Sequence, residues 1–200
     1  LPPPQIDETC DSSCFDEVPE EYSAPSEQIV ILPTGSGKSL CFMLPALLIE
    51  GITLIIFPLL ALIEDQGRRV QEIGEEPAIL RGGQSRQERE RLWNRLKNRE
   101  TRFILTNPET LKQEKILNRI QELPLAHMVI DETHTVSEWG DTFRPSYLEL
   151  TDIQRKLKVP QVTAFTATAS PKIIQRVTEI IFPEIRPEEL NIIKANPDRP

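Results

Sequence analysis

Ile-Val-Ile-Leu-Pro-Thr-Gly-Ser-Gly-Lys-Ser, residues 29–39, is the stretch that decides the fold. An apolar run leads directly into a glycine-containing loop, and a helical pattern begins near Lys38. Gly35 and Gly37 allow a tight backbone whose N–H groups turn toward an anion, and the following helix directs its positive dipole end at the same place. This order predicts a phosphate-binding loop, in preference to a surface turn with a solvated lysine.

Each polar residue of the loop has an expected role. Lys38 is expected to reach the β- and γ-phosphates of a bound nucleotide, and Ser39 to bind Mg²⁺. The strict pattern G-x-x-x-x-G-K-[ST] is not met, because Leu32 stands where the first glycine belongs. The residues expected to surround the phosphates are Thr34, Gly35, Ser36, Gly37, Lys38 and Ser39.

Short apolar runs alternate with helical patterns along the rest of the chain. Several runs are continuous in Val, Ile and Leu, which is typical of strands covered on both faces. We expect strands at 29–32, 53–57, 78–80, 103–106, 127–130, 162–165 and 191–193, and helices at 38–50, 59–73, 85–99, 109–121, 146–157 and 171–181. The alternation predicts right-handed βαβ units, and therefore an α/β fold with a doubly wound, mostly parallel sheet and helices on both faces.

The charge of the chain is distributed unevenly. The formal net charge is −8, but residues 1–24 hold seven carboxylates and no Lys or Arg. The other 176 residues carry 24 acidic and 23 basic groups, so they neither indicate nor exclude a DNA-binding surface. We interpret residues 1–27 as an acidic, Pro-rich extension, 28–195 as the domain, and 196–200 as a linker.

The cysteines and the hydropathy point to an intracellular protein. Cys10, Cys14 and Cys41 are interpreted as free thiols, because a structural zinc site needs four ligands and both histidines lie far along the chain. No apolar run approaches the ~18–20 residues that span a bilayer. The first residues also lack the basic and apolar regions of a signal peptide.

A second apolar run ends in carboxylates, in Leu-Ala-His-Met-Val-Ile-Asp-Glu-Thr-His (125–134). Carboxylates at the C-terminal edge of a parallel strand face the ligand crevice. Asp131 is placed to hold Mg²⁺, and Glu132 to orient and deprotonate an attacking water, as phosphoryl transfer to water requires. An acidic helix cap looks the same in isolation. The phosphate loop about ninety residues upstream favours the catalytic interpretation.

Five stretches carry a family resemblance. They are Phe-Pro-Leu-Leu-Ala-Leu-Ile-Glu-Asp-Gln (57–66), Thr-Asn-Pro-Glu-Thr-Leu (106–111), Asp-Glu-Thr-His (131–134), His-Thr-Val-Ser-Glu-Trp-Gly-Asp-Thr-Phe-Arg-Pro-Ser-Tyr (134–147) and Ala-Phe-Thr-Ala-Thr-Ala-Ser (164–170). These stretches resemble motifs of the RecQ family of ATP-dependent DNA helicases, in superfamily 2. The fourth is the most specific, since it matches the Ser-x-Trp-Gly-x-x-Phe-Arg-Pro core of that family's aromatic-rich loop in full. The resemblance covers roughly residues 28–200, nearly all of one RecA-like domain.

The resemblance implies a motor domain that uses ATP and Mg²⁺ to unwind DNA in repair and recombination, located in the cytoplasm (nucleoid) or the nucleus. It implies that His134 contacts the γ-phosphate or a partner motif, and that Thr166 and Thr168 link the ATP and DNA sites. The implied partners are DNA, both single-stranded and at duplex junctions, and a second RecA-like domain of the full-length chain. Without that domain, the chain is not expected to unwind DNA.

The aromatic-rich loop also has a physical interpretation of its own. Trp139, Phe143 and Arg144 follow the carboxylates, and aromatic faces and a guanidinium stack on unpaired bases at ~1–3 kcal/mol per base. The alternative is that the two rings pack beneath the loop. Two residues depart from the family pattern: Thr133 replaces the usual Ala, and Thr142 replaces an Asp.

Three other functions share some of these motifs. An RNA helicase of the Asp-Glu-x-His type shares the ATP motifs but lacks the Ser-x-Trp-Gly-x-x-Phe-Arg-Pro loop. A small-molecule P-loop kinase needs an Arg-rich lid and an acceptor pocket, neither of which the sequence places. A nucleotide-binding interaction module without turnover is disfavoured, because both Lys38 and Glu132 are retained.

Overall fold

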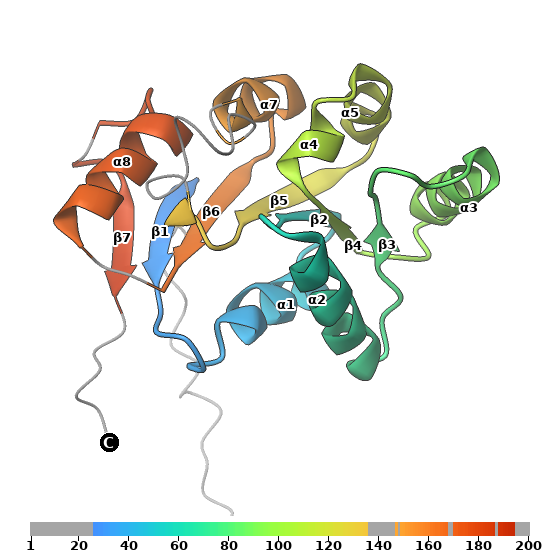
Figure 1. Ribbon diagram of the computed structural model, residues 1–200, viewed down its shortest axis with the longest axis horizontal. Coiled ribbons are helices and arrows are strands. Elements are labelled where there is room, and N and C mark those ends of the chain that lie inside the picture. The colour runs from blue at the N-terminus through green and yellow to red at the C-terminus, as the bar shows by residue number, and fades with distance from the viewer. Residues whose placement is uncertain (1–25, 136–146, 148, 168–169, 187, 195–200) are drawn as a thin grey trace, which may run out of the picture.

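The computed structural model describes residues 26–135, 147, 149–167, 170–186 and 188–194 (Figure 1). Its strands are β1 (Glu27–Ile31), β2 (Ile52–Ile56), β3 (Ala78–Ile79), β4 (Phe103–Thr106), β5 (Leu125–Ile130), β6 (Gln161–Thr166) and β7 (Asn191–Lys194). They form one sheet in the order β3-β4-β2-β5-β6-β1-β7, and all neighbouring pairs are parallel. The seven predicted strands are all present, which confirms the expected fold class.

Helices cover both faces of this sheet. They are α1 (Lys38–Leu48), α2 (Leu60–Glu72), α3 (Arg86–Lys97), α4 (Pro108–Leu111), α5 (Glu114–Gln121), α7 (Leu150–Leu157) and α8 (Pro171–Ile181). Figure 1 shows α1 and α2 on one side of the sheet, and α4, α5, α7 and α8 on the other. None of the helices within the described ranges is long and apolar enough to cross a membrane.

The sheet separates two hydrophobic cores, which explains the continuous apolar strands of the sequence. In β2, Leu54 and Ile56 join the core beneath α3, α4, α5, α7 and α8, whereas Ile55 joins the core beneath α1 and α2. All five residues of β2 are buried. A strand that packs on both faces has no solvent-facing positions, so its sequence lacks the alternation of apolar and polar residues that a half-exposed strand shows.

Two predicted helices differ from the structure. The helix expected at 109–121 is two helices, α4 and α5, which are separated at Lys112 and Gln113. The helix expected at 146–157 is described from Leu150 as α7, and its predicted first residue lies outside the described residues.

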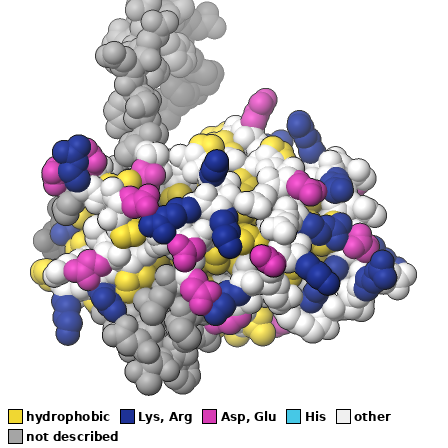
Figure 2. Space-filling view, turned by 90° about the horizontal axis from the view of Figure 1, so that it is seen from above, with side chains coloured by type: hydrophobic (Ala, Val, Ile, Leu, Met, Phe, Trp, Pro, Cys, Tyr) yellow, Lys and Arg dark blue, Asp and Glu magenta, His cyan; other side chains and the backbone are white. Residues whose placement is uncertain are grey.

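The face that carries α4, α5, α7 and α8 has a mixed charge. Figure 2, seen from above Figure 1, shows basic and acidic side chains interspersed over it. Exposed ion pairs account for part of the mixture, since Arg119 Nη1 lies 2.8 Å from Glu90 Oε1 and Arg155 Nη2 lies 2.7 Å from Glu184 Oε1. The described residues of this face therefore form no surface of a single sign.

Candidate functional site

The loop after β1 has the geometry of an anion cradle. The N–H and Oγ of Ser36 both donate to the Pro33 carbonyl, at 3.2 and 2.7 Å, and so close a tight turn. Gly35 and Gly37 have φ angles of 83° and 81°, in the left-handed region that favours glycine. A Cβ at Gly35 would meet nothing within 4 Å, so the space above the loop is open. The first turn of α1 contains no acidic residue that would repel an anion.

The sheet order brings the carboxylate loop to this cradle. β6 lies between β1 and β5, so the loops that follow β1 and β5 flank the C-terminal end of β6. Lys38 Nζ lies 3.0 Å from Asp131 Oδ1 and 2.6 Å from Glu132 Oε1. Three side chains predicted to act together, from segments about ninety residues apart, thus meet at one edge of the sheet.

The two carboxylates lie in different electrostatic environments. Burial raises the pKa of Asp131, and the Lys38 ammonium opposes this effect. The pKa of Glu132 is instead lowered to about 2, chiefly by its contact with His134 and also by Lys38. His134 Nδ1 lies 3.2 Å from Glu132 Oε2. Glu132 is therefore ionised at neutral pH.

The residues fit a magnesium-bound triphosphate. Mg²⁺ prefers oxygen ligands and is usually held by one or two protein side chains together with phosphates and water. The Asp131 carboxylate and the Ser39 hydroxyl offer oxygen atoms of this kind. The described residues contain no cluster of three or more His, Cys, Asp or Glu side chains that would hold a metal ion alone. The open cradle beside Asp131 would accommodate the phosphates.

The carboxylate loop has an unusual backbone. Glu132 adopts a left-handed conformation with a φ of 51°, although it carries a side chain. The Asp131 N–H donates to Ile56 O at 2.9 Å, and the N–H and Oγ1 of Thr135 donate to Glu132 O at 3.0 and 2.8 Å. The N–H and Oγ1 of Thr133 both donate to Phe165 O, at 2.9 and 3.0 Å. The sequence marked Thr133 only as a departure from the family pattern, and this contact to β6 was not predicted.

The other predicted site residues divide into two groups. Thr166 ends β6, is buried, and its carbonyl accepts a hydrogen bond from Leu32 N at 3.0 Å, immediately before the phosphate loop. It therefore lies between the phosphate loop and the carboxylate loop, and its linking role stays a prediction. The predictions for Trp139, Phe143, Arg144 and Thr168 lie outside the described residues.

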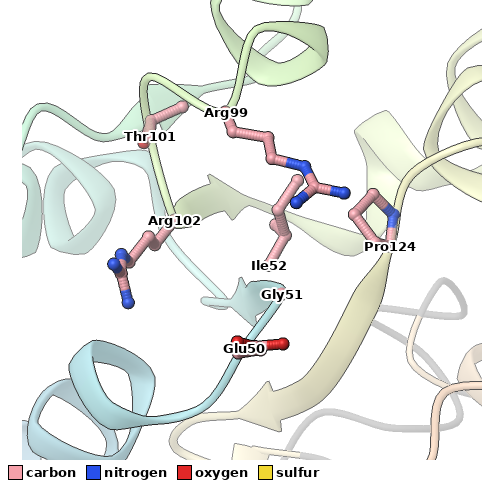
Figure 3. A pocket seen from close by; sticks show the side chains of 7 residues that line it. All are labelled: Glu50, Gly51, Ile52, Arg99, Thr101, Arg102 and Pro124. Carbon is pink, nitrogen blue, oxygen red and sulfur yellow. The ribbon is translucent and has the colours of Figure 1, made fainter.

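A hollow at the opposite edge of the sheet is separate from this site (Figure 3). It has a volume of about 370 Å³ and lies where β2 and β4 begin and where α1 and α3 end. Figure 3 shows Arg99 pointing toward Pro124, while Arg102 turns away and donates to Leu47 O at 2.9 Å. Leu47 lies in the last turn of α1, where the helix carries partial negative charge, so Arg102 complements that helix end.

Sequence comparison identifies the family. The DEAD/DEAH box helicase profile matches residues 14–177, most of the chain. The chain belongs to the DEAD/DEAH box helicase family. The matched range includes Lys38, Asp131 and Glu132.

Individual relatives of this helicase domain confirm the resemblance to RecQ proteins. It is 37% identical over 166 residues to the probable ATP-dependent DNA helicase RecS of Bacillus subtilis, an alignment that covers 82% of this chain and 33% of that protein. It is 39% identical over 160 residues to the ATP-dependent DNA helicase RecQ of Synechocystis, covering 76% of this chain and 33% of the relative. The chain thus spans about a third of the length of these relatives.

Solved helicase structures share the fold. The Pyrococcus furiosus Hef helicase domain superposes with a TM-score of 0.63 at 23% identity, over 86% of this chain and 35% of that one. The DUF1998 helicase MrfA, solved bound to DNA, has a TM-score of 0.66 at 21% identity, over 86% of this chain and 25% of its own. At these identities the likeness shows a shared fold.

Proposed function

We propose that the chain is the ATP-binding motor domain of an ATP-dependent DNA helicase, which couples ATP hydrolysis to strand unwinding in DNA repair and recombination. The observation that carries the proposal is the position of Lys38 Nζ between Asp131 and Glu132, beside the glycine loop. The names of the RecS and RecQ relatives supply the substrate class.

Each group of the chain has a distinct task in this proposal. The backbone of Thr34–Gly37 and the Lys38 ammonium bind the phosphates, while Ser39 and Asp131 hold Mg²⁺. The metal, when bound, neutralises charge that develops on the transferred phosphoryl group. Glu132 orients the attacking water and takes its proton, because it is ionised at neutral pH and 25% exposed.

The Lys38 contacts also suggest how the site changes when nucleotide binds. Lys38 Nζ forms ion pairs with both carboxylates in the described structure. A triphosphate would attract the same ammonium, and the magnesium would take its place beside Asp131. Glu132 would then be released from Lys38 to contact water.

DNA binding and unwinding belong to the full-length protein. We propose that Trp139, Phe143 and Arg144 contact DNA, and that His134, Thr166 and Thr168 relay this contact to the nucleotide. Residues 28–195 are proposed as the first RecA-like domain, preceded by the extension 1–27 and followed by a linker at 196–200 to a second such domain. DNA as substrate implies that the protein acts in the nucleoid or the nucleus.

Nucleotide binding tests the proposal directly. Titration of the chain with a fluorescent ATP analogue and Mg²⁺ should give saturable binding, and Lys38→Ala should weaken it at least tenfold with an unchanged circular dichroism spectrum. The matched control is Lys112→Ala, since Lys112 also pairs with a glutamate, Glu149, at 2.7 Å but lies on the surface. The control should bind as the wild type does. Equal affinity of the Lys38→Ala and wild-type chains would contradict the proposal.

A further inference from the structure

We infer that Thr133 is a positioning residue, whose hydroxyl fastens the loop that carries Glu132 to the end of β6. Its effect on hydrolysis rests on the proposed function, but the contact itself does not. The RecQ motif that this stretch resembles has Ala at this position, and Ala has no hydroxyl.

The hydroxyl supports a local departure from the sheet. β5 and β6 pair in register as far as Ile130 and Ala164. Continued pairing would place Asp131 beside Phe165, but the chain turns at Glu132 and it is Thr133 that bonds Phe165 O. Thr133 therefore closes a short excursion from which Asp131 and Glu132 reach Lys38.

This excursion needs support because of its backbone. The left-handed φ of 51° at Glu132 is unfavourable for a residue with a side chain and persists only where the surroundings impose it. Thr135 restrains the loop from its far side through Glu132 O. Thr133, which is fully buried, is the side chain that restrains it from β6.

The acceptor of the Thr133 hydroxyl is itself tied to the phosphate loop. The neighbouring carbonyl, Thr166 O, accepts from Leu32 N at 3.0 Å, at the entrance to that loop. The Phe165 ring packs edge-on against Phe42 of α1, with the ring centroids 5.5 Å apart. A residue fastened to Phe165 O is thus fastened to the strand and the helix that position Lys38, so Thr133 sets the distance between Glu132 and the phosphates.

Three variants separate a positioning role of the Thr133 hydroxyl from a merely structural one. Thr133→Val keeps the shape of the side chain, and Phe165 O retains the Thr133 N–H as a donor, so the variant should fold. Thr133→Ser keeps the hydroxyl. The matched control is Thr101→Val, because Thr101 is also buried and its Oγ1 lies 3.3 Å from a backbone carbonyl, Phe103 O, at the opposite edge of the sheet.

Hydrogen exchange of the nucleotide-free chain tests the contact. Thr133→Val should accelerate exchange of the amides of residues 133–135 about tenfold, whereas Thr133→Ser and Thr101→Val should leave those amides within twofold of the wild type. Unchanged exchange in Thr133→Val would overturn the inference.

Single-turnover hydrolysis tests the positioning role. Thr133→Val should slow hydrolysis about tenfold while its Kd for ATP stays within twofold, and Thr133→Ser should restore the rate. A normal rate of hydrolysis in Thr133→Val would overturn the positioning role. The role would also be overturned if Thr133→Val and Thr101→Val lost the same amount of hydrolysis rate and of ATP affinity. A wild-type chain that neither binds nor hydrolyses ATP would instead contradict the proposed function, and hydrogen exchange would then decide the inference alone.

Discussion

Asp131 and Glu132 are neighbours in the chain but differ in exposure: the Asp131 side chain is 6% exposed and that of Glu132 is 25% exposed. A buried carboxylate favours a bound cation, whereas a partly exposed one can meet water. Glu132→Gln should therefore leave Mg²⁺-dependent ATP binding intact and slow hydrolysis by ~10²-fold or more, as the loss of a general base does. Asp131→Asn should weaken Mg²⁺-dependent binding itself. Binding titrations with and without Mg²⁺, together with single-turnover rates, separate these effects. If Glu132→Gln weakened binding and Asp131→Asn slowed only hydrolysis, the roles of the two carboxylates would be the reverse of those proposed.

The aromatic-rich loop gives a second residue-scale prediction, for the full-length protein. Trp139→Ala should preserve basal ATP hydrolysis but remove most of its stimulation by single-stranded DNA, since the ring is proposed to stack on bases. If Trp139 only packs beneath the loop, the change should cost ~3–5 kcal/mol of stability and lower both rates. Thermal melts and hydrolysis assays with DNA, with RNA and without nucleic acid distinguish these results. Stimulation by RNA alone would favour the Asp-Glu-x-His RNA helicase alternative.

The residues of the phosphate site could be predicted from the sequence because they lie in or at the end of the loops that follow two buried strands, β1 and β5. Lys38, Asp131 and Glu132 were expected at the C-terminal edge of a parallel sheet, and the structure brings them together. The contact of Thr133 with Phe165 could not be predicted, because it depends on the register between β5 and β6 and on the left-handed turn at Glu132. The local sequence specifies neither this register nor this turn.

At the scale of elements, the division between α4 and α5 shows the limit of reading helical patterns. Leu111 and Ile116 are both buried, but they are five positions apart. In one continuous helix, the residues on the same face as Leu111 would be Glu114 and Lys115. The extended backbone at Gln113 corrects this phase, so that Ile116, Leu117 and Ile120 face the core. The pattern of polar and apolar residues predicted a helix in this region, but it did not predict the break at Lys112 and Gln113 that changes which residues face the core.

The start of α3 allows an element-scale prediction. Ser85 and Glu88 form a capping box, in which Ser85 Oγ accepts from Glu88 N at 3.2 Å and Glu88 Oε2 accepts from Ser85 N at 2.7 Å. Ser85→Ala should cost about 1 kcal/mol, or roughly 2–4 °C in Tm for a chain of this size. The control Gln87→Ala, at an exposed position of the same turn, should change stability by less than ~0.5 kcal/mol. Denaturant titrations measure both, and equal stability of the two variants would show that the cap contributes nothing.

At the scale of the whole molecule, a buried histidine makes stability depend on pH. His127 Nε2 lies 2.8 Å from Thr163 Oγ1, Nδ1 has no hydrogen-bond partner within the described structure, and burial lowers the pKa to about 4. The His127 imidazole becomes protonated near pH 6.5 in the unfolded chain but only near pH 4 in the folded chain. Stability is therefore fully present above pH 6.5 and falls by about 3 kcal/mol as the pH drops through 4, beyond which this contribution is constant. Urea titrations at pH 7 and pH 4.5 should show that the free energy of unfolding falls in the wild type and falls less in His127→Gln. An equal fall in both proteins would exclude His127 as its source.

The fold class was predictable from the alternation of strands and helices, but the strand order was not. β1 is the first strand in the chain, yet it lies between β6 and β7. Nothing in residues 27–31 specifies partners so far away. Their apolar side chains require only that the strand be covered on both faces.

This strand order has a consequence for biosynthesis. The partners of β1 lie far downstream, with Gln28 paired to Thr163 and to Asn191. A ribosome that adds roughly 5–20 residues per second needs about 7–27 s to pass from Gln28 to Thr163. Until then β1 has no neighbouring strand that could hold the glycine loop beside Asp131 and Glu132, so we expect that the nascent chain does not yet hold a nucleotide. Bound ATP can assist only the last stage of folding, and a premature stop before β6 should yield a product that nucleotide cannot rescue.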